Sequence, residues 1–190
     1  TDNSPYLTFE WKAGKDGEIH QVRTQLIGEY NFPNALAAIT IGRFFGVEAQ
    51  KIDEALAEYT PQNNRSQLKK TEDNTLIIDA YNANPTSMMA ALQNFRNMTV
   101  PHKMLLLGDM RELGAESAAE HQKIVDYIKD SSFEKVWLVG EQFAAAQHSF
   151  KTYANVQEVI KELETNKPKG YTILIKGSNG IKLSSTVEHL

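Results

Sequence analysis

The 190-residue sequence contains no cysteine. This excludes disulfides, thiolate metal ligands and cysteine nucleophiles, and it makes a reducing, cytoplasmic setting the expected one. Long hydrophobic runs are also missing. Runs such as Met104–Leu107 and Ile173–Ile175 are far shorter than the ~18 residues that a membrane span needs. The N-terminus lacks the basic and then apolar pattern of a signal peptide, so we expect no membrane partner.

An excess of positive charge is absent as well. Twenty lysines and arginines stand against 24 acidic residues, which gives a net charge of −4. No overall basic field would attract a phosphate backbone, and we expect no nucleic-acid partner. The hydrophobic fraction of 41% is typical of soluble globular proteins. The length allows one large domain or one domain with part of a second. Because the chain opens on Thr1 and not on methionine, we expect a piece of a longer protein.

The first third of the chain has a pattern of its own. Residues 6–11 and 18–26 alternate between apolar and polar side chains around a turn cluster, which predicts an antiparallel hairpin. Helices are predicted over residues 35–45, between Pro33 and Gly46, and over residues 50–58. A polar stretch follows. We therefore predict one domain over residues 1–70 and a second over residues 71–190.

Short apolar runs alternate with helical patterns in the second region. Strands are predicted over residues 75–78, 104–107, 136–139 and 171–175, with a weaker one at 152–153. Helices are predicted over residues 86–97, 118–129, 142–150 and 156–166. This alternation is typical of an α/β fold with a Rossmann-like, doubly wound and mostly parallel sheet.

Polar side chains follow three of the predicted strands. They occur in residues 79–85, 108–114 and 176–180. Ligands of open parallel sheets bind beyond the carboxyl ends of the strands, and cations and amides suit a phosphorylated or zwitterionic ligand.

Simpler interpretations of these residues also exist. Asp79 and Asp109 are both suited to capping turns, and Asn84 to capping a helix. Lys176-Gly177-Ser178 is by itself typical of a tight turn, and Arg65 of a solvated charge. The five histidines are scattered without metal-ligand spacing, so no metal site is predicted.

Five segments, in their order and spacing, resemble the Mur ligase family. They are Gly28 to Ala38, Asn64-Arg65, Asp79 to Met88, Leu107 to Gly114, and Lys176-Gly177-Ser178. Within the family, residues 81–85 and 108–114 are similar to those of the ligases that act on UDP-N-acetylmuramoyl-tripeptide and D-alanyl-D-alanine. The P-loop pattern G-x-x-x-x-G-K-[ST] does not occur in the sequence, so the chain by itself cannot hold a nucleoside triphosphate in that way.

The resemblance implies a different role for each of the two predicted domains. Residues 1–70 would be the end of a central ATP-binding domain without its P-loop, and residues 71–190 a complete C-terminal Rossmann-like ligase domain. The implied reaction is ATP-dependent amide-bond formation through an acyl phosphate in peptidoglycan synthesis, in a monomeric protein. ATP and Mg²⁺ would be bound mainly by the missing part, so the isolated chain is expected to be inactive. The third residue of the tripeptide, diaminopimelate or lysine, stays open.

The resemblance also implies roles for single residues. Asn31 and Asn34 match positions at the adenine side of ATP, Arg65 matches a hinge arginine, and Asp79 an aspartate near the ribose.

Tyr81, Asn82 and Asn84 match the catalytic loop that faces the reaction centre. Lys176 and Ser178 match a turn near the incoming dipeptide, where they would hold its carboxylate. Asp109 and Glu112 lie on the same edge without an implied role.

Two other functions are open from the residues alone. One is a signalling receiver domain, which also has carboxylates and a lysine at the ends of its strands. Asp79, Asp109 and Lys176 would be the matching residues here. Receivers need two adjacent acids after the first strand, however, and Ala80 follows Asp79. The other alternative is a nucleotide-binding module without catalytic activity.

Overall fold

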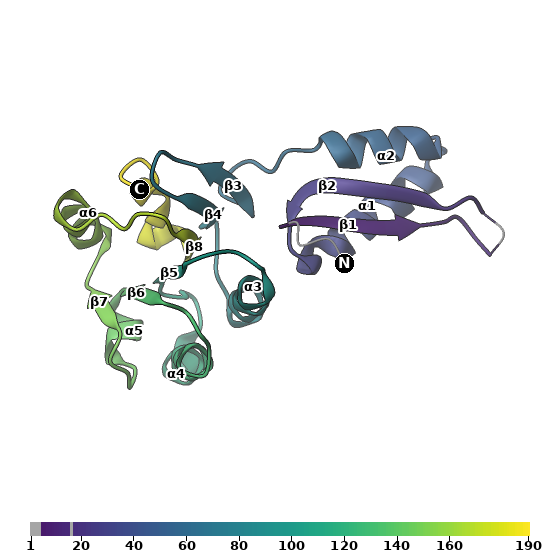
Figure 1. Ribbon diagram of the computed structural model, residues 1–190. Coiled ribbons are helices and arrows are strands. Elements are labelled where there is room, and N and C mark those ends of the chain that lie inside the picture. The colour runs from purple at the N-terminus through teal and green to yellow at the C-terminus, as the bar shows by residue number, and fades with distance from the viewer. Residues whose placement is uncertain (1–4, 16) are drawn as a thin grey trace. The chain divides into compact units, whose positions relative to one another are not determined.

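The computed structural model describes residues 5–15 and 17–190, which form two compact units (Figure 1). The first unit comprises the described residues up to Pro61, and the second runs from Gln62 to Leu190. This division precedes the predicted boundary after residue 70, because the strand Gln67–Lys70 pairs with the sheet of the second unit. The assignment of the two parts to an ATP-binding remnant and a ligase domain stays a prediction.

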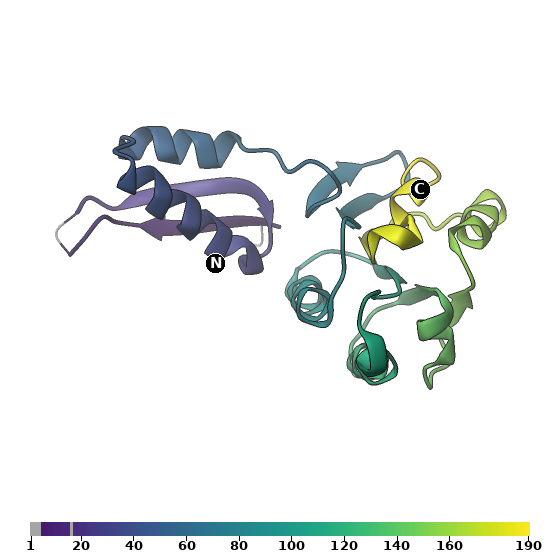
Figure 2. The same cartoon turned by 180° about the vertical axis from the view of Figure 1, so that it is seen from behind.

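The first unit is a hairpin covered by two helices (Figure 2). The hairpin consists of β1 (Tyr6–Trp11) and β2 (His20–Ile27), and the helices are α1 (Phe32–Phe44) and α2 (Ala49–Glu58). Alternation along β1 turns Leu7, Phe9 and Trp11 into the core of this unit. The indole Nε1 of Trp11 also donates to Asp53 Oδ1 at 2.7 Å, which ties α2 to the hairpin.

The second unit is built on a six-stranded, mostly parallel sheet, which confirms the predicted fold class. Its strands are β3 (Gln67–Lys70), β4 (Thr75–Asp79), β5 (Lys103–Gly108), β6 (Lys135–Val139), β7 (Lys151–Tyr153) and β8 (Thr172–Lys176). They lie in the order β3-β4-β8-β5-β6-β7, and only β3 runs antiparallel to its neighbour. The last strand in chain order, β8, therefore lies between β4 and β5.

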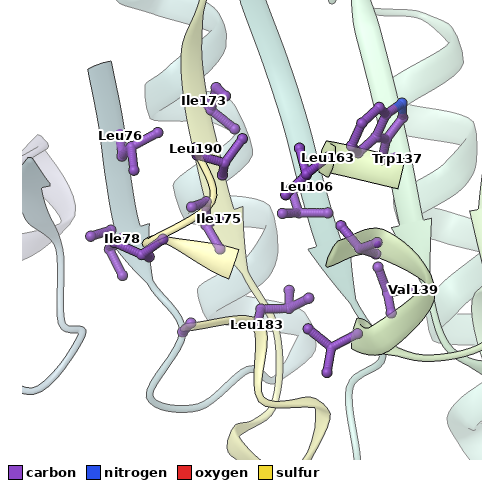
Figure 3. Packing of buried hydrophobic residues seen from close by; sticks show 14 of the residues in the cluster. Leu76, Ile78, Leu106, Trp137, Val139, Leu163, Ile173, Ile175, Leu183 and Leu190 are labelled. Atoms are coloured by element: carbon purple, nitrogen blue, oxygen red, sulfur yellow. The ribbon is translucent and has the colours of Figure 1, made fainter. Parts of the chain in front are cut away.

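Helices cover both faces of this sheet. They are α3 (Pro85–Asn97), α4 (Ser117–Lys129), α5 (Glu141–Ala145) and α6 (Val156–Thr165). Two short 3-10 turns, Asn179–Ile181 and Leu183–Thr186, follow β8 and are called the C-terminal turns. On one face, alternate strand residues such as Ile78, Leu106 and Ile175 pack against Leu163 of α6 and Leu183 of the C-terminal turns (Figure 3). Helices α3 and α4 lie on the opposite face (Figure 1). Apolar side chains on both sides of each central strand explain why the strand sequences are continuously hydrophobic.

One predicted helix is wrong in length. Helix α5 ends at Ala145, whereas the pattern predicted a helix over residues 142–150. The hydrogen bonds that would continue it are diverted to side chains. His148 Nε2 donates to the carbonyl oxygen of Phe143 at 2.8 Å, and the N–H of Gln147 donates to Gln122 Oε1 at 2.7 Å. The chain therefore leaves the helix early and continues into β7.

Candidate functional site

Three loops meet at the carboxyl edge of the sheet around β8. These are residues 79–85 after β4, residues 108–114 after β5, and residues 176–180 after β8. In the parallel register Lys176 lies beside Asp79 on one side and Leu107 on the other. The chain passes from β4 to β5 and later returns to insert β8 between them. Such a change of direction is where open α/β sheets form a crevice for ligands.

A buried ion pair joins the first and third loops. Lys176 Nζ donates to Asp79 Oδ2 at 2.5 Å and to the carbonyl oxygen of Asn82 at 3.3 Å. The lysine side chain is only 2% exposed and that of Asp79 is 15% exposed. The second carboxylate oxygen, Oδ1, accepts the N–H of Ser66 at 3.3 Å. A charge this deeply buried requires a partner, so the pair fixes the start of the 79–85 loop.

All three polar residues of the predicted catalytic loop are exposed. The ring of Tyr81 is 45% exposed, and the Arg65 guanidinium stacks on it with Cζ 3.8 Å from the ring centroid, a cation–π contact. Asn82 is also exposed. Asn84 caps α3: its Oδ1 accepts the N–H of Ser87 at 2.8 Å, as the simpler interpretation predicted.

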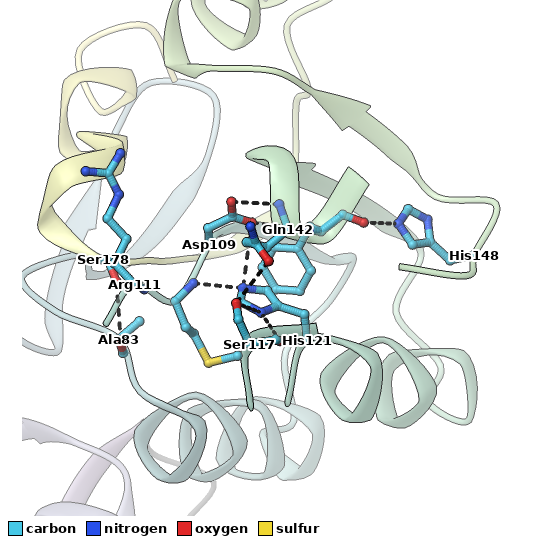
Figure 4. A network of polar contacts seen from close by, with 10 residues as sticks. Ala83, Asp109, Arg111, Ser117, His121, Gln142, His148 and Ser178 are labelled. Atoms are coloured by element: carbon cyan, nitrogen blue, oxygen red, sulfur yellow. Dashed lines mark hydrogen bonds and ion pairs between the residues drawn. The ribbon is translucent and has the colours of Figure 1, made fainter. Parts of the chain in front are cut away.

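The hydroxyl of Ser178 connects all three loops (Figure 4). Its Oγ accepts the N–H of Arg111 at 2.8 Å and donates to the carbonyl oxygen of Ala83 at 3.4 Å. Ser178 is buried, and its hydroxyl is therefore a link within the domain.

Asp109 and His121 connect the 108–114 loop to α5 and α4 (Figure 4). Asp109 accepts the N–H groups of Gln142 at 3.0 Å and Phe143 at 2.9 Å, so it caps α5 and not the turn that follows it. His121 is fully buried and accepts the N–H of Met110 on Nε2 at 3.0 Å. Its Nδ1 lies 2.7 Å from the carbonyl oxygen of Ser117 and must be the protonated nitrogen. The histidine is thus neutral and structural.

Sequence comparison identifies the family. The family described as "Mur ligase, glutamate ligase domain" matches residues 64–179. The chain belongs to the Mur ligase family. It is 34% identical over 176 residues to the UDP-N-acetylmuramoyl-tripeptide–D-alanyl-D-alanine ligase of Bacillus subtilis, covering 87% of this chain and 38% of that protein. The ligase of the same name from Escherichia coli is 32% identical over 175 residues, covering 87% and 38%.

Solved structures agree with this membership. A crystal structure of MurF from Acinetobacter baumannii superposes with a TM-score of 0.81 at 26% identity, covering 97% of this chain and 42% of that one. MurF from Thermotoga maritima in complex with ADP shares the fold, with a TM-score of 0.77 at 16% identity, covering 97% and 45%. The chain thus spans less than half the length of these Mur ligases.

The structure brings together only some of the site residues predicted from the Mur ligase resemblance. Arg65, Asp79, Tyr81, Asn82, Asn84, Lys176 and Ser178 all lie at the carboxyl edge of the second unit. Asn31 and Asn34 belong to the first unit. There Asn31 Nδ2 donates to the carbonyl oxygen of Ile27 at 2.9 Å, and Asn34 Nδ2 donates to Asn31 Oδ1 at 3.2 Å. Their role at ATP stays a prediction.

No role for His121 is predicted from the sequence. A usable signal was present, because the buried Ile124, Val125 and Ile128 of α4 follow His121 at helical spacings of three, four and seven residues. Within residues 5–15 and 17–190, no three histidine or acidic side chains are grouped as a metal site would require. Nor is any helix in that part of the chain long and apolar enough to cross a membrane.

Proposed function

We propose that this chain is part of an ATP-dependent ligase that joins D-alanyl-D-alanine to UDP-N-acetylmuramoyl-tripeptide in peptidoglycan synthesis. The observation that carries the proposal is the convergence of the 79–85, 108–114 and 176–180 loops, linked by Ser178 and Lys176. These loops contain three of the five segments on which the family resemblance rests. Relatives that bear this ligase name match most of the chain.

In this proposal the second unit is the C-terminal ligase domain, which begins at Gln62 and not at the predicted residue 71, and the first unit is the end of the ATP-binding domain. The surface of α1 supports an incomplete first domain. Phe44 is 82% exposed, and Leu36, Ile41 and the following Phe45 are exposed as well. Large apolar side chains gathered on one helix are normally covered by further polypeptide. No described residue of the first unit covers them.

The proposed reaction has two chemical steps. The γ-phosphoryl group of ATP passes to the terminal carboxylate of the tripeptide, and ADP leaves. The amine of D-alanyl-D-alanine then attacks the resulting acyl phosphate, which forms the amide bond and releases phosphate. Bound ATP supplies the phosphoryl group, and Mg²⁺ neutralises its charge. The protein must supply further cations, orient the amine and exclude water from the hydrolysable intermediate.

Several residues of this chain fit those tasks. The Arg65 guanidinium is exposed, and no carboxylate among the described residues is paired with it, so it is available for a phosphate oxygen. The ion pair of Asp79 and Lys176 holds the loop that carries Tyr81 and Asn82. In this proposal Mg²⁺ and most of ATP are held by the rest of the ATP-binding domain, outside residues 1–190.

Phosphate release tests the proposed function. The complete encoded protein, including whatever flanks residues 1–190, is incubated with ATP, Mg²⁺, UDP-N-acetylmuramoyl-tripeptide and D-alanyl-D-alanine. We expect amide product and phosphate in equal amounts, with neither formed when the dipeptide is omitted. Dipeptide-independent phosphate release without product would contradict the proposal. The chain of residues 1–190 alone should be inactive under the same conditions, and a rate near that of the complete protein would contradict this second expectation.

The receiver-domain alternative is disfavoured by the hydrogen bonds of its two candidate acceptors. Both carboxylate oxygens of Asp109 accept backbone N–H groups, and those of Asp79 are bonded to Lys176 and Ser66. Labelling of either aspartate by a small phosphodonor would favour the receiver function again.

A further inference from the structure

Arg111 is a charged residue at the carboxyl edge that no role described so far uses. Its backbone N–H is held by Ser178 Oγ at 2.8 Å, so the start of the side chain is fixed beside the 176–180 turn. The guanidinium end points toward the C-terminal turns (Figure 4). Among residues 5–15 and 17–190, none accepts a hydrogen bond from this guanidinium or forms an ion pair with it. The residue is exposed, and its charge is therefore not neutralised within the described chain.

The neighbouring turn leaves space for this guanidinium. A Cβ atom built on Gly180 would collide with Nη1 of Arg111 and would lie 2.8 Å from its Cζ. The guanidinium thus lies directly against the backbone of Gly180, in a position that a side chain there would occupy. This second feature distinguishes Arg111 from an arginine that simply extends into solvent.

Two other cations of this edge already have a partner or a proposed role. Lys176 is buried and neutralised by Asp79, and Arg65, which stacks on Tyr81, is proposed above to bind a phosphate oxygen. Ser178 is bonded to Arg111 and Ala83. The earlier prediction gave the carboxylate of the dipeptide to Lys176 and Ser178, yet the polar atoms of both are used within the domain. Arg111 adjoins the same turn with its donors available.

A guanidinium with free donors is suited to a planar anion. Its N–H groups match the two oxygens of a carboxylate in a bidentate arrangement, and they bind phosphate oxygens with similar geometry. The ligase proposed above has one substrate, D-alanyl-D-alanine, that must be held by its carboxylate end while its amine reacts. We propose that Arg111 binds the carboxylate of this dipeptide and that Gly180 keeps the position of the guanidinium open. The inference rests on the proposed function.

The test is steady-state kinetics on the complete encoded protein with the Arg111→Gln substitution. We expect the KM for D-alanyl-D-alanine to rise about 10- to 100-fold, because hydrogen bonds to a charged group are lost. The KM values for ATP and for UDP-N-acetylmuramoyl-tripeptide should not change. D-alanyl-D-alaninamide, which lacks the carboxylate, should be a poor substrate whose KM is the same in the variant and the unsubstituted protein. The KM of Arg111→Lys for D-alanyl-D-alanine should lie between those of the unsubstituted protein and Arg111→Gln, since lysine keeps the charge but loses the bidentate geometry.

A steric variant tests the role of the turn independently. Gly180→Ala keeps the charge of Arg111 but displaces its guanidinium, and it should also raise the KM for the dipeptide. In the Arg111→Gln background, Gly180→Ala should not raise the KM for the dipeptide any further, because the guanidinium that it would displace is already absent. Arg96→Gln is the matched control. Arg96 lies near the end of α3, a helix that begins at the carboxyl edge and ends away from it, and its loss should leave all KM values unchanged.

The outcomes separate the inference from the function on which it rests. An unchanged KM for D-alanyl-D-alanine in an active Arg111→Gln variant overturns the inference and leaves the ligase function standing. A rise in the KM for ATP alone also overturns it, because it assigns the guanidinium to a phosphate. An equal rise for the dipeptide and its amide excludes the carboxylate as the bound group. If the unsubstituted protein forms no amide product, the proposed function itself fails.

Discussion

Replacing Lys176 by methionine should strongly destabilise the second unit. Methionine has a similar length and fills the buried space, but it leaves the Asp79 carboxylate with only the N–H of Ser66 as a partner. Removing one member of a buried ion pair costs about 3–5 kcal/mol. Because the Asp79 side chain is still 15% exposed and water reaches it in part, we expect the lower end, about 3 kcal/mol.

Urea unfolding measures this loss in one unit at a time. The sequence has two tryptophans, and each unit contains one of them: Trp11 lies in β1 and Trp137 in β6. In a Trp11→Phe background, fluorescence therefore reports unfolding of the second unit alone. For an m-value of about 2 kcal/mol/M, a loss of about 3 kcal/mol lowers the urea midpoint by about 1.5 M.

Two further variants decide whether the unpaired charge is the cause. The double variant Asp79→Asn with Lys176→Met carries no buried charge and should recover most of the lost stability. Lys69→Met removes the ion pair of Lys69 with Glu188, whose side chains are 40% and 79% exposed, and should cost less than about 1 kcal/mol. A midpoint shift below about 0.3 M in Lys176→Met, no larger than that of Lys69→Met, would refute the reasoning.

Two other substitutions test local features. Gly140→Ala places a Cβ on a residue with φ of 120°, where it collides with the Asp109 carboxylate. We expect the free energy of unfolding in urea to fall by about 1–3 kcal/mol. A decrease of only about a few tenths of a kcal/mol would argue against the collision. Hydrogen bonds from Lys167 and Lys169 lower the pKa of Asp73 below its usual range. A carboxylate whose pKa is lower in the folded protein than in the unfolded chain stabilises the fold at pH values above its unfolded pKa. This stabilisation disappears as the pH falls through the pKa of the folded state. Asp73→Asn should therefore lower the melting temperature at pH 7 and cease to do so in strong acid; an equal effect at both pH values would contradict the assignment.

The strand arrangement of the second unit follows from its sequence pattern with one exception at the edge. The central strands are continuously hydrophobic, and the structure places all of them within a residue or two of the prediction. Strand β3 was not predicted, because Gln67-Leu68-Lys69-Lys70 is short and polar. Such a composition suits an edge strand, whose pairing depends on a neighbour and not on its own burial.

The site is predictable in its location but not in its internal bonds. Asp79, Asp109 and Lys176 each follow an apolar run, so their place at the carboxyl edge could be derived from the pattern. That Lys176 is neutralised by Asp79 depends on β8 lying beside β4, a neighbour relation that chain order does not reveal. The burial of Lys176 and the bonds of Ser178 follow from the same relation. The roles of the predicted ligand-binding residues still depend on the kinetic tests.

The central place of β8 also has a consequence for the order of folding. Strands β3 and β4 on one side, and β5, β6 and β7 on the other, share no ladder until β8 is inserted between them. Since β8 follows all of them along the chain, both half-sheets are synthesised before it. Until β8 is added, their inner edges are unpaired and can pair with the wrong strand. Contacts so distant in sequence also slow folding. A chain that stops short of Thr172 would contain five of the six strands and yet no continuous sheet, and it would lack both Lys176 and Ser178.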